Sequence, residues 1–152
     1  QWKLSRHHLD ELAAISQQRA AAANDAGLFA AEITAVDGVN TDQGIRPGTT
    51  VESLAALKPA FNPEGVVTAG NASQISDGSA ALLVMTSERA KELGLTPIAR
   101  IHTNVMAGVN PVIMLTGPIP ATEKALKKSG LTLSDIGTFE VNEAFASVLG
   151  AW

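Results

Sequence analysis

The chain has 152 residues, of which 45% are hydrophobic and 17% charged, a composition typical of a folded domain and unlike that of a disordered polymer. Its net charge of −4 and pI near 5.3 argue against nucleic acid as a partner, because a phosphate backbone attracts a basic surface. No apolar run is long enough to cross a membrane, and no apolar signal core is present at the start. We therefore expect a cytoplasmic protein with no nucleic-acid or membrane partner.

The chain contains no cysteine, which excludes disulfides, thiolate metal ligands and a cysteine nucleophile within these residues. Its three histidines, His7, His8 and His102, do not have the spacing of a metal site. We therefore expect no bound metal and no permanently bound cofactor.

Residues 5–26 are predicted to form a helix. Ser5 can serve as its N-cap, and Gly27 stands where a left-handed C-cap is usual. Small and apolar side chains recur at three- and four-residue steps, which indicates a helix that packs closely against a neighbour. They are Leu9, Leu12, Ala13, Ser16, Ala20 and Ala23.

The next part of the chain is irregular. A short strand is expected at 33–36, followed by a polar stretch without a clear period. Thr49 and Glu52 form a capping-box pattern that predicts a short helix over 51–57. Irregular surface segments of this kind often carry function.

From about residue 66 onward, predicted strands and helices alternate, which indicates an α/β domain with helices packed over a sheet. The first 65 residues lack this order and are predicted to form a separate, mainly helical element. Strands are expected at 66–69, 79–86, 98–105 and 138–141, and helices at 88–93, at 120–129 and from residue 143.

Each of three polar segments permits a structural and a functional interpretation. Residues 71–78 carry small and hydroxyl side chains suited to close approach of a ligand, but also the Asn and Asp-Gly residues of ordinary turns. Residues 114–120, with two prolines and a glycine, are expected to form a stiff loop that is either purely structural or the wall of a ligand site. Asn142 could hold a water or an oxyanion, or simply cap a helix. Glu143 is expected in the first helical turn, where the helix dipole favours a carboxylate without any catalytic role.

Taken together, these segments resemble the thiolase family in order and spacing. The resemblance covers essentially the whole chain, and it also includes residues 16–20 and 57–61. The matching stretches read Gly65-Val66-Val67-Thr68-Ala69-Gly70-Asn71-Ala72-Ser73, Ser76-Asp77-Gly78, Thr116-Gly117-Pro118-Ile119-Pro120-Ala121 and Asn142-Glu143-Ala144-Phe145-Ala146.

The resemblance implies an α/β layered fold of two tandem βαβαβαββ halves, with a loop domain inserted in the first half. By this likeness, residues 1–75 are the second part of the CoA-binding loop domain. Residues 76–96 are the last strand and helix of the first half, and residues 97–152 begin the second half. We therefore expect the chain to be an internal fragment of a longer thiolase.

Thiolases cleave 3-ketoacyl-CoA with CoA, or run the reverse Claisen condensation, through a cysteine acyl-enzyme that splits one difficult step into two easier ones. The family's catalytic cysteines and histidine fall outside this chain, so the segment alone is expected to be inactive. The resemblance implies that Asn142 holds the water of an oxyanion hole while also capping its helix. Family habit further implies a homodimer or homotetramer.

The resemblance also assigns CoA-binding positions, with CoA as a substrate. Arg46 would lie beside the nucleotide end with Ser53 nearby, and Ser73 would hydrogen-bond the pantetheine amide. The remaining positions are apolar or small: Phe61 and Ala69 would line the pantetheine channel, and Met114 and Phe145 would form walls near the acyl group.

Two positions depart from the biosynthetic thiolase pattern. Gln74 replaces a glycine, and residues 114–117 are less glycine-rich. Both favour a degradative, β-oxidation thiolase. The competing interpretation is a noncatalytic CoA-binding or assembly module derived from a thiolase.

Overall fold

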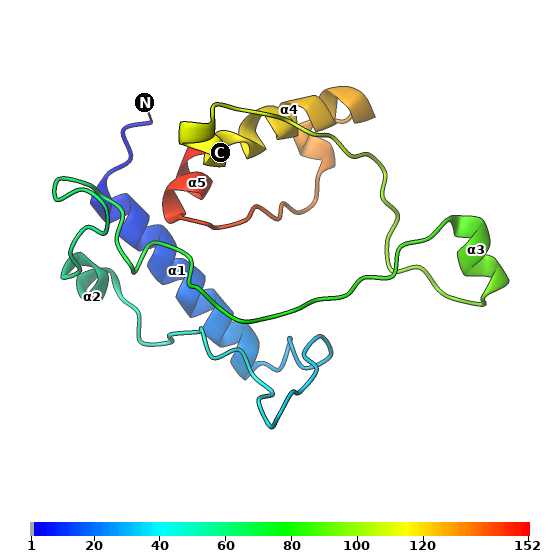
Figure 1. The fold of residues 1–152 in the computed structure, drawn as a ribbon, viewed down its shortest axis with the longest axis horizontal. Helices are drawn as coiled ribbons and strands as arrows, with labels where there is room; N and C mark the ends of the chain where they lie inside the picture. Colours follow the sequence, from blue (N-terminus) through cyan, green and yellow to red (C-terminus); the bar gives the residue numbers. More distant parts are fainter. Residues whose placement is uncertain (1) are drawn as a thin grey trace. The chain divides into compact units, whose positions relative to one another are not determined.

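The computed structural model describes residues 2–152, which form helices and extended segments (Figure 1). Two compact units are present: residues up to Ser76 together with Glu140–Trp152, and Asp77–Phe139. The elements in chain order are α1 (Arg6–Asp25), α2 (Val51–Ala55), α3 (Ser87–Glu92), the 3-10 helix η1 (Pro111–Thr116), α4 (Pro118–Ser129), the 3-10 helix η2 (Leu133–Asp135) and α5 (Ala146–Ala151).

Helix α1 confirms the prediction for residues 5–26, including both ends. The Ser5 hydroxyl accepts a hydrogen bond from the His8 N–H at 3.2 Å. At the other end, Gly27 has φ of +70°, and the N–H groups of Gly27 and Leu28 return to carbonyls of the last turn. This arrangement satisfies carbonyls that a helix end otherwise leaves without donors.

The first unit is built around α1, which contacts both α2 and α5. A small core forms where Ala13 and Ala14 of α1 meet Leu54 of α2, with Val51 partly buried beside them. The alanines lack bulk beyond Cβ, so the two helices approach closely, as the alanine-rich stripe predicts.

The predicted strands are largely extended, but no β-ladder forms among residues 2–152. The only pairings within this range are isolated bridges between Val36 and Val39, Pro59 and Thr68, and Ala72 and Phe145. The expected strands at 79–86, 98–105 and 138–141 take part in no β-bridge or ladder in the described part of the chain. Extended apolar sequence sets the backbone conformation, but a strand also needs a neighbour to accept its hydrogen bonds.

The second unit contains α3 and α4. Helix α3 is capped by Thr86 and begins at Ser87, one residue before the predicted start at residue 88. Helix α4 begins at Pro118, slightly before the predicted start, and ends as expected at Gly130, which has φ of +75°. Lys124 and Lys128 of α4 donate to the carbonyls of Met106 and Asn104, at 2.7 and 2.9 Å, and so hold the preceding extended segment along the helix.

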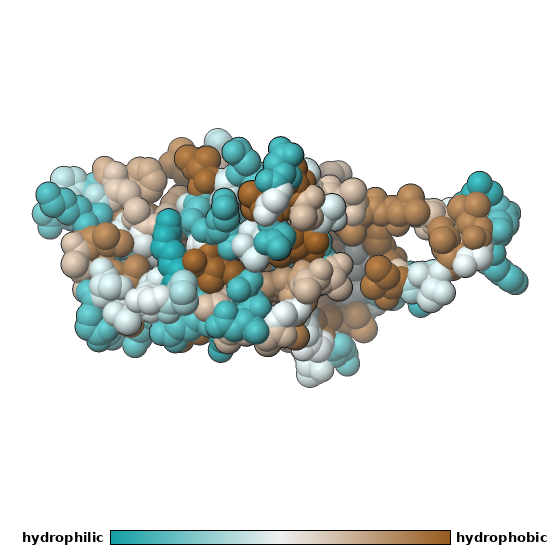
Figure 2. All heavy atoms as spheres, turned by 90° about the horizontal axis from the view of Figure 1, so that it is seen from below, coloured by the Kyte–Doolittle hydropathy of each residue, from teal (hydrophilic) through white to brown (hydrophobic). Residues whose placement is uncertain are grey.

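Many large apolar side chains are exposed, and Figure 2 shows apolar atoms interspersed with hydrophilic ones over the face that it presents. In the second unit, Leu82, Leu83 and Val84 are 91%, 79% and 69% exposed. A parallel-sheet strand normally buries both faces, so this segment has the sequence of a core strand without the burial of one. Within the described range, no helix combines the length and hydropathy that crossing a membrane requires.

Asp135 at η2 provides a local test of the hydrogen bonding in the second unit. Hydrogen bonds from the Thr132 side chain, and then from its backbone N–H, lower the pKa of Asp135 from its ordinary value of 3.8. Because the folded-state pKa is lowered, the contribution to stability is present above the unfolded pKa and is lost as the pH falls through the folded one.

We expect Thr132→Ala to raise the pKa of Asp135 toward its ordinary value, as measured by NMR titration of the side-chain carboxyl carbon. The lowered pKa of Glu88, which depends on its own backbone N–H and on Thr86, serves as an internal control and should not move. An unchanged pKa of Asp135 in the variant would contradict the assignment.

Candidate functional site

The first unit contains a cleft of about 130 Å³ between α1, the segment 70–74 and Glu143. Its lining is mostly small or polar, which leaves room and hydrogen-bonding groups for a polar, narrow ligand. The residues that line it are Ala13, Ser16, Gln17, Gly70, Asn71, Ala72, Ser73, Gln74 and Glu143.

The segment 71–73 is fixed against the residues that lead into α5. The Ser73 N–H donates to the Ala144 carbonyl at 2.9 Å, and the Ala146 N–H donates to the Asn71 carbonyl at 2.9 Å. Between these bonds, Ala72 forms an antiparallel bridge with Phe145. Two segments far apart in the sequence therefore form one wall of the cleft.

Three predicted site residues meet at this wall. The rings of Phe61 and Phe145 lie edge to face, with centroids 6.2 Å apart and planes at 78°. Phe61 is 78% exposed, so the pair presents an apolar surface to solvent. Ser73 is exposed beside the Ala72 bridge, and its hydroxyl makes no hydrogen bond to residues 2–152, which leaves it available to a ligand.

Glu143 does not lie where the sequence predicts. Helix α5 begins at Ala146, so Glu143 precedes the helix and is not in its first turn. Its carboxylate accepts a hydrogen bond from the Ser16 hydroxyl of α1 at 2.8 Å, across 127 sequence positions. Glu143 thus closes one end of the cleft, and the helix-dipole explanation for it is wrong.

Asn142 is not a helix cap, which corrects the second half of its predicted role. The pairing of Phe145 with Ala72 keeps the preceding backbone extended and delays the start of α5, whose N-cap position is Phe145. Asn142 is exposed and adjoins Glu143, which lines the cleft, although Asn142 itself does not.

Two glutamines tie the irregular loop of residues 42–49 to the cleft. Gln17 of α1 accepts the Arg46 N–H at 2.7 Å, and Gln74 donates to the Gly44 carbonyl at 2.6 Å. The Arg46 side chain is exposed, and its guanidinium forms no hydrogen bond or ion pair within the described residues. Arg46 is thus held by its backbone while its charge faces solvent.

Three further predicted residues lie outside the cleft lining. Ser53 forms a capping box with Thr50 at the start of α2, one residue later than the predicted box of Thr49 and Glu52. Ala69 is exposed in the turn that Thr68 begins. Met114 is 65% exposed in η1 of the second unit, so its place relative to the cleft stays a prediction.

No group of three or more histidine, aspartate and glutamate side chains within residues 2–152 is arranged to hold a metal ion. The lining of the cleft offers hydroxyl, amide and carboxylate groups, and the aromatic pair of Phe61 and Phe145 lies outside that lining.

Models of two protein families match the chain in succession. The thiolase N-terminal domain matches residues 1–88, and the thiolase C-terminal domain matches residues 95–151. The chain belongs to the thiolase family.

The chain is similar to larger thiolases, of which it spans about 40%. The 3-ketoacyl-CoA thiolase of Erwinia tasmaniensis is 53% identical over 95% of this chain and 40% of the relative. Human mitochondrial 3-ketoacyl-CoA thiolase in complex with CoA superposes with a TM-score of 0.92 at 45% identity, over 97% of this chain and 38% of the other. The acetyl-CoA acetyltransferase of Bacillus anthracis gives a TM-score of 0.91 at 43% identity, over 98% and 40%. The chain therefore has the thiolase-like layered fold expected from the sequence, in the part that it spans.

The site residues assigned from the sequence did not include the polar lining residues Ser16, Gln17, Asn71 and Gln74, although Asn71 and Gln74 lie in the segment 71–78 that was interpreted as a possible ligand site. A usable signal was present for Ser16 and Gln17, because both are polar side chains in an alanine-rich helix and Ser16 lies on its small and apolar stripe. A polar interruption in an otherwise apolar helix face indicates either a buried hydrogen bond or a site.

Proposed function

We propose that this chain is the CoA-binding part of a longer thiolase polypeptide that cleaves 3-ketoacyl-CoA with CoA, or runs the reverse condensation. The observation that carries the proposal is the cleft in the first unit, which is lined by Ser73 and whose wall is joined to the ring pair of Phe61 and Phe145 through the bridge between Ala72 and Phe145. A pantetheine arm combines amides with methylenes and suits such a lining. Membership of the thiolase family and the CoA complex of a similar human enzyme support it.

In this proposal, Ser73 hydrogen-bonds a pantetheine amide, and Phe61 and Phe145 provide its apolar wall. Ala69 lies along the same path. Met114 provides a wall nearer the acyl group.

Two polar residues have roles outside the lining. Arg46 binds the phosphorylated nucleotide end, with Ser53 close by, because a guanidinium without an internal partner can pair with phosphate. Asn142 holds a water that stabilises an oxyanion during acyl transfer.

We further propose that CoA and acyl-CoA are the partners, and that the whole protein is a cytoplasmic homodimer or homotetramer in β-oxidation. The proposed division is a CoA-binding loop domain over 1–75, the end of the first half over 76–96, and the start of the second half over 97–152. The names of the 3-ketoacyl-CoA thiolase relatives favour the degradative direction.

The 152 residues by themselves are proposed to be inactive, because they contain no cysteine to form the acyl-enzyme. We expect the intact mass of the natural polypeptide, measured by mass spectrometry, to be well above 15.7 kDa, and we expect that polypeptide to catalyse thiolysis. A natural mass of 15.7 kDa, with CoA binding but no thiolysis, would instead favour the noncatalytic CoA-binding module.

Replacing Ser73 with alanine is expected to raise the KM for CoA by up to about ten-fold and to leave kcat nearly unchanged, because one hydrogen bond to bound substrate is lost. Steady-state thiolysis by the full-length polypeptide measures both constants. Ser76→Ala is the matched control, since Ser76 is exposed nearby but does not line the cleft. Equal KM values for the two variants would refute the role of Ser73.

A further inference from the structure

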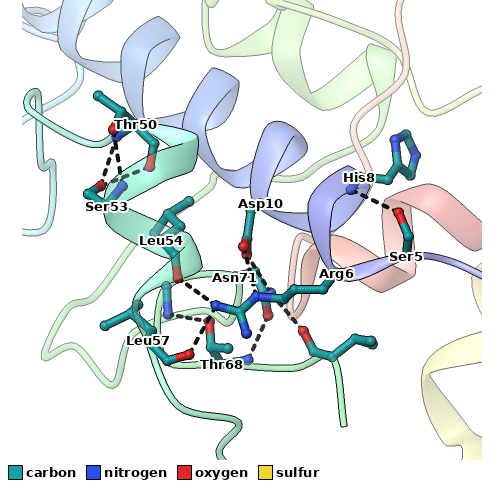
Figure 3. A network of polar contacts seen from close by, with 12 residues as sticks. Ser5, Arg6, His8, Asp10, Thr50, Ser53, Leu54, Leu57, Thr68 and Asn71 are labelled. Atoms are coloured by element: carbon teal, nitrogen blue, oxygen red, sulfur yellow. Dashed lines mark hydrogen bonds and ion pairs between the residues drawn. The ribbon is translucent and has the colours of Figure 1, made fainter. Parts of the chain in front are cut away.

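A buried carboxylate lies behind the wall of the cleft. Asp10 of α1 is 1% exposed and accepts a hydrogen bond from Arg6 Nε at 2.7 Å and another from Asn71 Nδ2 at 3.0 Å (Figure 3). Asp10 is not among the residues that line the cleft. Both of its oxygens have a donor, so its charge is compensated where water does not reach it.

Asn71 connects this carboxylate to the cleft wall, and both the nitrogen and the oxygen of the Asn71 side-chain amide are hydrogen-bonded. Its amide nitrogen donates to Asp10 and to the Val66 carbonyl at 3.0 Å, and its amide oxygen accepts the Thr68 N–H at 2.9 Å. Asn71 is 3% exposed. A side-chain amide with both donors and its acceptor engaged has one favourable orientation, so these bonds fix the position of the residue.

Arg6 extends the cluster to α2. Its Nη2 donates to the carbonyls of Leu54 and Leu57, at 2.5 and 3.1 Å, at the end of that helix (Figure 3). Arginine suits this role because its planar donors reach several acceptors at once. The cluster therefore joins α1, the end of α2 and the turn of residues 66–71.

The backbone of Asn71 continues into the wall that carries Ser73. The Asn71 carbonyl accepts the Ala146 N–H, and two residues later the Ser73 N–H donates to Ala144. We propose that Asp10 and Asn71 are positioning residues that set the place of Ser73 for the CoA substrate, with Asp10 acting through Asn71. This inference rests on the proposed function, because it assumes that the cleft binds CoA.

The variant Asp10→Asn, made in the full-length polypeptide, tests the proposal. It keeps the shape of the side chain but turns one acceptor into a donor, so either Arg6 or Asn71 loses its partner. We expect the KM for CoA to rise about ten-fold and kcat to stay within about two-fold of the wild-type value. This pattern indicates the loss of an interaction that stabilises the bound substrate and the transition state equally. Hydrogen exchange at the Ser73 and Ala146 amides is expected to accelerate by about ten-fold or more.

Ser5→Ala is the matched control, because it weakens the N-cap of the same helix without touching the cluster. It is expected to lower stability while leaving both the KM for CoA and the exchange at Ser73 unchanged. If Asp10→Asn behaves in the same way, its role is only to stabilise the fold, and the proposal is overturned.

Asn71→Ser is a second variant, which serves as the test if Asp10→Asn fails to fold. It leaves the ion pair of Asp10 and Arg6 intact and so creates no uncompensated charge. Its KM for CoA should rise similarly, and adding Asp10→Asn to it should change KM no further. Additive effects would show that Asp10 does not act through Asn71. If Ser73→Ala also leaves KM unchanged, the proposed contact of Ser73 with CoA is wrong, whereas the proposed function itself fails only if the full-length wild-type polypeptide does not catalyse thiolysis. If only Ser73→Ala raises KM, the positioning role alone is wrong.

Discussion

Replacing Arg6 with methionine is expected to destabilise the first unit by about 1–3 kcal/mol, because buried Asp10 loses one of its two donors while Arg6 itself is 24% exposed. Asp10, which is 1% exposed in the wild-type chain, would keep the hydrogen bond from the Asn71 amide as its one donor among residues 2–152. The carbonyls of Leu54 and Leu57 would also lose the hydrogen bond from Arg6, although Leu54 keeps the one from the Leu57 N–H. Methionine keeps most of the apolar length of arginine, so the effect isolates the guanidinium.

Native-state hydrogen exchange of the α1 amides measures this loss, because it reports the opening free energy of one element within a larger protein. Arg19→Met is the control, since Arg19 is exposed on the same helix. A further variant with Arg6→Met and Asp10→Leu should recover much of the stability, because an apolar pair leaves no buried charge. If the α1 amides have equal opening free energies in Arg6→Met and Arg19→Met, the ion pair of Arg6 and Asp10 makes no net contribution to the stability of the first unit.

The sequence predicts best those features that depend on neighbours along the chain. Helix α1 begins after Ser5 and ends before Gly27, and α4 ends before Gly130. These ends are predictable because caps and left-handed glycines act within one turn of the helix end. The same local chemistry places α2, although its capping box uses Thr50 and Ser53.

The sequence predicts less well where distant segments decide the outcome. Residues 142–145 have the pattern of a helix start, but pairing of Phe145 with Ala72 holds them extended. The contact of Ser16 with Glu143 likewise joins residues 127 positions apart, which no local pattern reveals. Strand formation has the same dependence, because residues 79–86 have the composition of a core strand and no ladder partner within the described range.

The candidate site was predictable in part for this reason. Phe61, Ser73 and Phe145 come from segments that resemble thiolases, and the structure brings them to one wall. Asp10 gives no such signal, because an aspartate beside the apolar stripe of a helix is normally solvated. Its burial becomes apparent only when Asn71, 61 positions away, is seen to donate to it.

Gly70→Ala is expected to destabilise the first unit by about 1–3 kcal/mol, the usual cost of adding bulk to a packed site. A methyl group at this position would overlap Leu54 Cδ2 and come within 2.6 Å of Leu57 Cδ1. The backbone of Gly70 is not in the left-handed region, so the requirement for glycine is one of space. Gly48→Ala is the control, because nothing lies within 4 Å of its added methyl.

A double-mutant cycle with Leu54→Ala separates this overlap from other causes. Leu54 is 5% exposed, and truncating it is expected to cost about 2–5 kcal/mol by leaving a cavity. In that background the overlap with Leu54 is removed and only the contact with Leu57, whose side chain is 38% exposed, remains, so Gly70→Ala should cost less than in the wild type. Exchange of the α1 amides measures each variant. An unchanged cost of Gly70→Ala in the absence of the Leu54 side chain would mean that close packing against α2 is not what requires glycine before Asn71.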